Sequence, residues 1–150
     1  MILGFMKRFP DKTETEFKSK ILDCYSHFKF NKFPKLHTVR TDQHKRWNAG
    51  MKIHFCTGVR TKQMDNFAMG VCKSVQEIEI WYCQKNDDNM LMSISIDDKE
   101  LGFKESERLA INDGFSDVVK FLEYFRPEAR YRDGYPVYRG RLIHWTDLKY

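Results

Sequence analysis

Alternating apolar and polar positions predict short strands over much of the chain. In residues 52–57, Ile53 and Phe55 alternate with polar neighbours, which is typical of a strand with one buried face. Patterns of the same kind predict strands at residues 2–6, 35–40, 71–83, 90–96 and 142–145. The apolar positions of the 71–83 segment change parity near Gln76, so we expect a bulge or a break there.

Apolar residues that recur every three or four positions predict helices. Phe17 and Ile21 fall on one face of a helix expected at roughly 14–28. Thr13 or Thr15 can cap its N-terminus, because a threonine hydroxyl accepts a hydrogen bond from an otherwise unpaired backbone N–H group.

Two shorter helices are expected downstream. The first covers roughly 104–112 and ends at Asp113-Gly114, where glycine permits the left-handed conformation that terminates many helices. Ser116 is a good N-cap for the second, which has an apolar face and ends at Pro127. Segments expected as loops include 41–49, 58–62 and the basic, tyrosine-rich 130–140, while 63–70 has no clear pattern.

The expected order of elements is β-α-β-β-β-β-α-α-β, which places the chain in the α+β class. Several strands with short loops and about three peripheral helices are typical of a small, mostly antiparallel β-barrel. The length of 150 residues suits a single domain, residues 1–150, with ample aromatic material for one core.

The distribution of charge favours an anionic partner such as nucleic acid. The formal net charge is +5, and the basic residues gather in one half of the chain. They are Lys29, Lys32, Lys35, Arg40, Lys45, Arg46, Lys52, Arg60 and Lys62. Acidic residues gather elsewhere, at 87–88, 97–98 and 105–107, so we expect one positive face.

Cysteine usage and hydropathy predict a cytoplasmic protein with reduced thiols and no contact with membranes. No apolar run approaches the roughly 20 residues of a membrane span. Basic Lys7-Arg8 follows the first apolar residues at once, which is not the pattern of a signal peptide. The four cysteines form no Cys-x-x-Cys pair.

Metal and cofactor sites have weak support in the sequence. Cys24 and His27 are three residues apart on a predicted helix and could share a metal, but nothing pairs with them, so we expect no metal. Cys56, near His54 and Arg60, is the one candidate for a nucleophilic cysteine. We expect no cofactor, since no glycine-rich phosphate loop or nucleotide fingerprint is present.

The segment Lys35-Leu-His-Thr-Val-Arg40 gathers an amine, a hydroxyl and a guanidinium in six residues. In an ideal strand Lys35 would share the face of His37, and Thr38 would lie on the opposite face. Lys35 and Thr38 can therefore meet only if the strand begins after Lys35 or bulges there. Pro34 favours a late start. The alternative is that the three polar residues lie on the surface of a half-exposed strand.

The Lys35-x-x-Thr38-x-Arg40 pattern, after an N-terminal helix and before a glycine and a strand, resembles the motif of the ASCH family in the PUA-like superfamily. Lys7-Arg8-Phe9 is similar to the basic end of the family's opening strand. Asp113-Gly114-Phe115-Ser116 is similar to its later helix junction. The resemblance implies a small PUA-like barrel with a cleft for RNA or nucleosides.

One branch of the family consists of small amidohydrolases that deacetylate N4-acetylcytidine. By resemblance, Lys35 and Thr38 would be catalytic together with Asp113, which stands where that branch has glutamate. A buried Lys35 beside Arg40 would have a lowered pKa and could act as the base. Thr38 would attack or position a water, and Asp113 would protonate or orient the leaving amine.

Three functions therefore remain open. The first is binding of RNA or a modified nucleoside in a basic cleft, with the ligand-binding candidates Arg40, Lys45, Arg46, Trp47, Arg60 and Lys62. The second is hydrolysis of an acyl-cytidine. The third is a protein-interaction module, for example of a virus or mobile element, that uses exposed aromatic residues at Trp47 and in the 131–138 segment.

Overall fold

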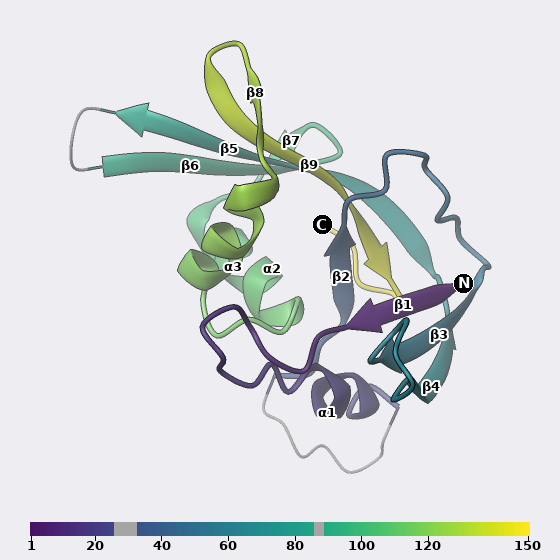
Figure 1. Ribbon diagram of the computed structural model, residues 1–150. Helices are drawn as coiled ribbons and strands as arrows, with labels where there is room; N and C mark the ends of the chain where they lie inside the picture. The colour runs from purple at the N-terminus through teal and green to yellow at the C-terminus, as the bar shows by residue number, and fades with distance from the viewer. Residues whose placement is uncertain (26–32, 86–88) are drawn as a thin grey trace.

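A computed structural model describes residues 1–25, 33–85 and 89–150, with the backbone alone for 83–85 and 89–91. Its strands form two sheets (Figure 1). The smaller sheet has the order β1-β3-β4, in which β1 is parallel to β3 and β4 is antiparallel to it. These strands are β1 (Ile2–Phe5), β3 (Lys52–Thr57) and β4 (Asp65–Val71).

The larger sheet is antiparallel and has the order β2-β9-β5-β6-β7, with β8 paired to β9. Its strands are β2 (His37–Arg40), β5 (Ser74–Lys85), β6 (Asn89–Ile96), β7 (Lys99–Glu100), β8 (Arg130–Arg132) and β9 (Tyr135–His144). The expected hairpin is confirmed, since β5 and β6 pair along most of their length. The hydrogen-bonded ladders of the described residues do not close the two sheets into one barrel.

The described residues also form three α-helices and a short 3-10 helix. They are α1 (Phe17–Leu22), α2 (Phe103–Asn112), α3 (Val118–Phe125) and η1 (Arg126–Glu128). Figure 1 shows α2 and α3 together beside β2 and the larger sheet, with α1 near β1. The predicted α+β class, with mostly antiparallel sheets and three helices, is confirmed. In the described part of the chain, no helix has the length and apolar character needed to cross a bilayer.

One hydrophobic core joins both sheets and the three helices. Ile78, Ile80 and Tyr82 of β5 are all buried and share one parity. The bulge expected near Gln76 is therefore wrong, because β5 pairs with β9 in unbroken register from Ser74 to Trp81. The break lies earlier, between β4 and β5, where the chain passes from one sheet to the other.

Helix boundaries differ from the sequence prediction at the caps. α1 begins at Phe17 with Glu16 as its N-cap, and the Thr15 hydroxyl accepts a hydrogen bond from the Phe17 N–H at 3.4 Å while it donates to the Met6 carbonyl at 2.7 Å. Asp117, not Ser116, caps α3 by accepting a hydrogen bond from the Lys120 N–H at 2.8 Å. The predicted end of the first helix, residues 26–28, lies outside the described residues.

The tyrosine-rich segment expected as a loop forms the β8–β9 hairpin instead. Asp133 and Gly134 form its turn with positive φ values of 51° and 83°. This pair of left-handed residues suits a tight hairpin, because its twist matches the twist of the flanking strands. The strand expected at 142–145 is the end of the much longer β9.

Candidate functional site

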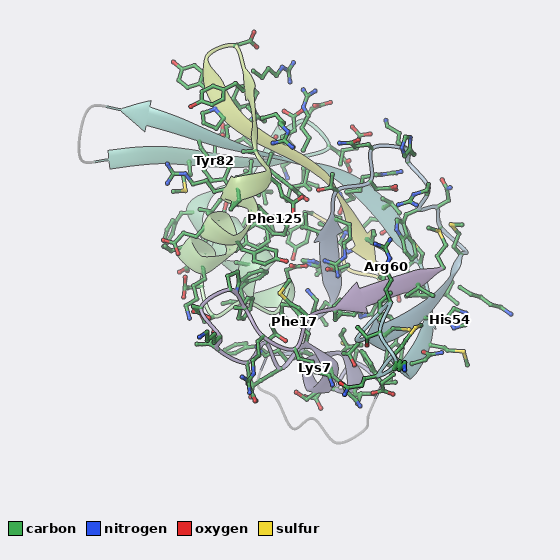
Figure 2. All side chains as sticks on the ribbon, viewed as in Figure 1. Lys7, Phe17, His54, Arg60, Tyr82 and Phe125 are labelled. Atoms are coloured by element: carbon green, nitrogen blue, oxygen red, sulfur yellow. The ribbon has the colours of Figure 1, made fainter. Side chains whose placement is uncertain are left out.

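A cavity of about 310 Å³ lies where β2, β9 and the α2–α3 junction meet. Figure 2 shows Phe17 and Phe125 in the interior of the molecule, whereas Arg60 and His54 lie on the side of the smaller sheet. The lining combines polar groups with aromatic rings: Gly4, Met6, Phe17, Lys35, Thr38, Val39, Arg40, Thr41, Asp113, Phe115, Tyr124, Phe125, Glu128 and Tyr138. The structure thus brings together Lys35, Thr38, Arg40 and Asp113, which sequence analysis selected.

Lys35 lies before β2 rather than in it, so the predicted late start of the strand is confirmed. The residue is 1% exposed, and its ammonium donates to both the carbonyl and the carboxylate of Asp113, with Nζ 3.1 Å from Oδ1. Its Nζ also lies 4.5 Å from the centre of the Phe17 ring. Burial lowers the pKa of Lys35 to about 8, although the Asp113 carboxylate acts in the opposite direction.

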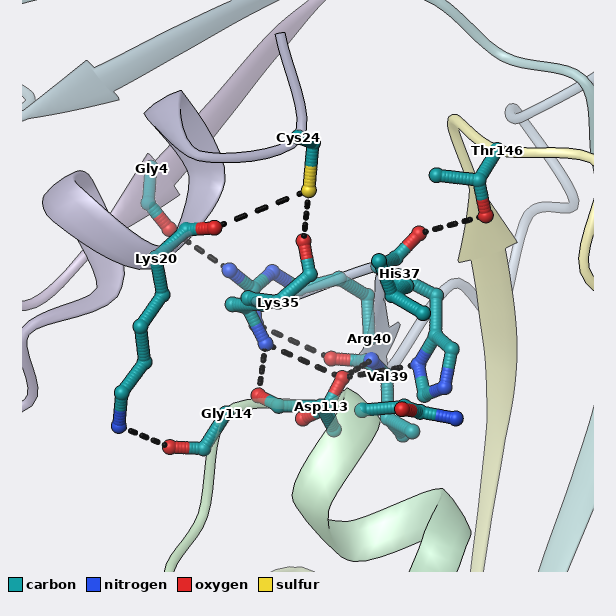
Figure 3. A network of polar contacts seen from close by, with 12 residues as sticks. Gly4, Lys20, Cys24, Lys35, His37, Val39, Arg40, Asp113, Gly114 and Thr146 are labelled. Atoms are coloured by element: carbon teal, nitrogen blue, oxygen red, sulfur yellow. Dashed lines mark hydrogen bonds and ion pairs between the residues drawn. The ribbon is translucent and has the colours of Figure 1, made fainter. Parts of the chain in front are cut away.

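Asp113 is the C-cap of α2 and is 2% exposed. Its Oδ1 atom accepts from the Val39 N–H at 3.1 Å and lies 3.1 Å from Lys35 Nζ and 3.3 Å from His37 Nδ1 (Figure 3). The helix ends here because Gly114 adopts the left-handed conformation, φ 92°, as predicted. The carboxylate is therefore fixed by a helix end and a strand that are 74 residues apart in sequence.

Thr38 and Arg40 complete the polar lining from β2. The Thr38 hydroxyl is buried and has no hydrogen-bond partner among the described residues. Arg40 donates to the carbonyls of Gly4 and Val39 at 2.8 and 3.0 Å, and its guanidinium lies 5.1 Å from the centre of the Phe5 ring. An unsatisfied buried hydroxyl is costly, so Thr38 is a candidate for contact with a ligand.

The other five ligand-binding candidates do not line this cavity. Lys45 Nζ lies 2.6 Å from Glu77, and Arg46 Nε lies 3.4 Å from Asp42. Arg60 and Lys62 are exposed between β3 and β4.

Trp47 was expected to be exposed and is instead buried, because its loop folds back on the core. Its backbone N–H donates to the Asp42 carboxylate at 3.0 Å. Trp47 thus anchors the loop, and its ring is not available to a partner.

The aromatic residues of the β8–β9 hairpin divide between surface and cavity. Tyr131 is 81% exposed, but Tyr138 is buried and lines the cavity, with its hydroxyl 3.2 Å from that of Thr41. The prediction that the whole segment is exposed is therefore wrong at Tyr138. Sequence reasoning missed this residue because it treated the segment as a loop, although alternation with Leu142 along β9 marks the inward face.

Cys56 does not have the setting of a nucleophile. It is fully buried, and burial raises the pKa of its thiol, with the nearby Asp65 carboxylate acting in the same direction. A reactive cysteine needs the opposite shift, so this candidate is wrong. His27 lies outside the described residues, and no group of three potential metal ligands occurs within them.

Two buried histidines lie behind the cavity. His37 contacts Asp113 and, through Nε2, the Tyr150 hydroxyl at 2.8 Å. The His144 ring lies 5.2 Å from that of His37, and neither of its nitrogens has a hydrogen-bond partner among the described residues. Burial lowers the pKa of both, that of His144 to about 3. The folded protein therefore holds both rings neutral at pH 7.

Stability is expected to fall with pH below about 6.5, the pKa of an unfolded histidine. In this range His144 is protonated in the unfolded chain but stays neutral in the folded protein. The free energy of unfolding therefore drops by up to about 1.4 kcal/mol for each unit by which the pH falls. His144→Phe should reduce that slope in denaturant unfolding measured from pH 7.5 to pH 4.5. Exposed His44→Gln is the control, and equal slopes for both variants and the wild type would contradict the prediction.

Comparison with known proteins reveals no relative. No protein-family model matches the chain, no curated protein matches it, and no solved structure matches it. The resemblance to the ASCH family therefore rests on the sequence motif alone.

Proposed function

We propose that the Lys35 cavity binds a nucleoside, either a free one or a single nucleoside of an RNA strand whose base enters the cavity. The observation that carries this proposal is the pairing of buried Lys35 and half-buried Arg40 with aromatic walls in one cavity. Flat rings such as Tyr124 and Phe115 can stack on a base, while the cations and Thr38 offer donors to its polar edge. A volume of about 310 Å³ is at the small end of ligand pockets.

The distribution of charge favours one base over a long stretch of RNA. Of the predicted basic cleft, only Lys35 and Arg40 line the cavity. The charges of Lys45 and Arg46 are balanced by Glu77 and Asp42. With two cations in the cavity, few phosphates would be neutralised there, so most of the binding free energy would come from the base itself.

The resemblance to ASCH domains supports the same ligand class. In that family the motif residues border a cleft for RNA or nucleosides, and here Lys35, Thr38 and Arg40 border one cavity. We also propose a reducing compartment such as the cytoplasm, since Cys56 and Cys72 are buried thiols outside any disulfide.

Binding can be tested by calorimetric titration with N4-acetylcytidine, cytidine and a short single-stranded RNA. We expect the acylated nucleoside to bind with little change between about 50 and 200 mM salt, because it carries no phosphate. Arg40→Gln should weaken binding, whereas Lys45→Gln, outside the cavity, should not. No binding of any ligand, or equal weakening by both variants, would overturn the proposal.

Hydrolysis of an acyl-nucleoside is a second candidate function, favoured by the unpartnered Thr38 hydroxyl in the same cavity as a lysine with a lowered pKa. Neutral Lys35 would take the hydroxyl proton, directly or through a water, as Thr38 Oγ1 attacks the acyl carbonyl. The C–N bond would break as the Lys35 ammonium returns the proton to the leaving amine. Water would then release the acid from Thr38, and Asp113 would hold Lys35 in place throughout.

Thr38→Val should abolish hydrolysis without lowering the stability of the fold. Valine has nearly the same shape but no hydroxyl, so the variant loses an unsatisfied buried polar group and should unfold at the wild-type temperature or above it. Turnover of N4-acetylcytidine should fall to background. Thr57→Val is a matched control, because the Thr57 hydroxyl is also buried and unpartnered among the described residues but lies outside the cavity. Full activity in Thr38→Val would exclude Thr38 as nucleophile.

The rate of hydrolysis should rise with pH through about 8. Lys35 must be neutral to accept a proton, and its pKa of about 8 makes the neutral form a minority below that pH. The expected log kcat/KM therefore increases with a slope of about one up to pH 8 and then levels off. A profile that is flat from pH 6 to pH 9 would contradict a basic role for Lys35.

A further inference from the structure

A chain of polar contacts leads from the cavity through buried His37 to the half-buried Tyr150 and Asn112. Lys35 Nζ lies 3.1 Å from Asp113 Oδ1, which lies 3.3 Å from His37 Nδ1 (Figure 3). His37 Nε2 lies 2.8 Å from the Tyr150 hydroxyl, which accepts a hydrogen bond from the Asn112 amide at 2.9 Å. The chain therefore connects the candidate base to groups that do not line the cavity.

The hydrogen-bond partners in this chain favour one tautomer of His37. The Asn112 amide nitrogen can only donate, so it occupies an acceptor site of the Tyr150 hydroxyl. That hydroxyl is then free to donate its own proton to His37 Nε2. A neutral imidazole with an accepting Nε2 carries its proton on Nδ1, which faces the carboxylate of Asp113.

The surroundings keep His37 uncharged. The titratable groups that face it are Asp113, Lys35, His144 and Tyr150. Burial is the largest effect and lowers the pKa of the ring; the Lys35 charge acts in the same direction, and Asp113 in the opposite one. The ring is fully buried, so it can donate to Asp113 without contact with solvent.

We propose that His37 is a positioning residue, which Tyr150 and Asn112 hold in the Nδ1–H tautomer so that it fixes the Asp113 carboxylate against Lys35. The functional importance of this arrangement rests on the proposed function of the cavity. The tautomer and the contacts are independent of that function, because the protonation of His37 and Lys35 can be measured without a substrate. In this arrangement Asp113 Oδ1 is shared by three N–H donors, those of Val39, Lys35 and His37. The carboxylate therefore stabilises the Lys35 ammonium less, and raises the pKa of Lys35 less, than it would without His37.

The tautomer can be read directly by nitrogen-15 NMR of the histidine side chains. We expect the His37 ring at pH 7 to be neutral, with its proton on Nδ1 and none on Nε2. A proton on Nε2, or a charged ring, would overturn the proposal.

The effect on Lys35 can be measured by following its ε-methylene group by carbon-13 NMR against pH. His37→Leu removes one donor from Asp113 Oδ1, which leaves more of the carboxylate charge to the ammonium, so the pKa of Lys35 should rise by about 0.5 or more. In His37→Asn the side-chain amide takes the place of Nδ1–H, and the pKa of Lys35 should stay near its wild-type value. Equal values in both variants would overturn the proposal.

If His37→Leu does not fold, Tyr150→Phe is an alternative variant, because it keeps the imidazole of His37 and the aromatic ring of residue 150 and removes only the hydroxyl. Without the hydroxyl, Nε2 loses the donor that favours its unprotonated state, so the pKa of His37 should rise. Tyr82→Phe is the matched control, since that buried hydroxyl donates to the Leu122 carbonyl at 2.7 Å, outside the chain of contacts. An equal titration of His37 in both variants would overturn the proposal. If the NMR results hold while no acyl-nucleoside binds, only the proposed function fails.

Discussion

Replacing Lys35 with methionine is expected to lower kcat/KM for N4-acetylcytidine hydrolysis by about 10²- to 10⁴-fold, the usual contribution of a general base. Methionine keeps an unbranched apolar chain in the space beside Phe17 but has no proton to exchange. Removing the ammonium leaves the buried Asp113 carboxylate without its countercharge, so we expect a loss of about 3–5 kcal/mol in stability, while the Val39 N–H and His37 still contact the carboxylate. Thermal unfolding and steady-state kinetics of the same preparation measure the two effects.

Lys20→Met is the matched control for this prediction. Lys20 is a partly buried lysine close to the site, and its Nζ donates to the Gly114 carbonyl at 2.9 Å without lining the cavity. We expect its loss to leave the turnover rate unchanged. A Lys35→Met protein that folds and hydrolyses the substrate at the wild-type rate would exclude Lys35 as the base.

Gly114→Ala is expected to destabilise the fold by about 2–5 kcal/mol. A left-handed backbone costs about 1–2 kcal/mol for a residue with a Cβ atom, and Gly114 has a φ of 92°. The new Cβ would also lie 2.9 Å from the Phe17 ring and 3.2 Å from Lys35 Cδ, and such overpacking costs about 1–3 kcal/mol. Denaturant unfolding should show the loss, and ligand binding should weaken because Lys35 is displaced.

Gly134→Ala separates the two costs. Gly134 has a similar φ of 83°, but nothing lies within 4 Å of its added Cβ, so only the backbone cost of about 1–2 kcal/mol remains. If both variants lose the same stability, the contact of Gly114 with Phe17 and Lys35 has no energetic role.

The parts of the site that the sequence predicted depend on local geometry. In an ideal strand Lys35 and Thr38 lie on opposite faces, so they can meet only if the strand begins after Lys35 or bulges there. Pro34 favoured a strand that begins after Lys35. The Asp113-Gly114 pair marked a helix end, which gives the carboxylate a fixed place. Their meeting could not be derived from these patterns, since it depends on the contact between the end of α2 and β2. Only the family resemblance suggested it.

The errors arise where tertiary contacts override local composition. Trp47 lies in a basic segment that reads as exposed, but its ring is taken into the core. Lys45 was counted as a free cation, although Glu77 from β5 balances it across the fold. Pairing of this kind has no signal in the sequence. The β8–β9 hairpin did have one, because Asp133-Gly134 is a typical two-residue turn.

Binding of a nucleoside in the Lys35 cavity can be followed by a two-dimensional NMR titration of the wild-type protein with N4-acetylcytidine. We expect saturable shifts centred on Lys35, Thr38 and Phe115 that disappear in Lys35→Met. Binding in this cavity would be contradicted if the shifts were centred on the ion-paired residues Lys45 and Arg139 on the outer face of β5 and β9, or if no signal moved at saturating ligand.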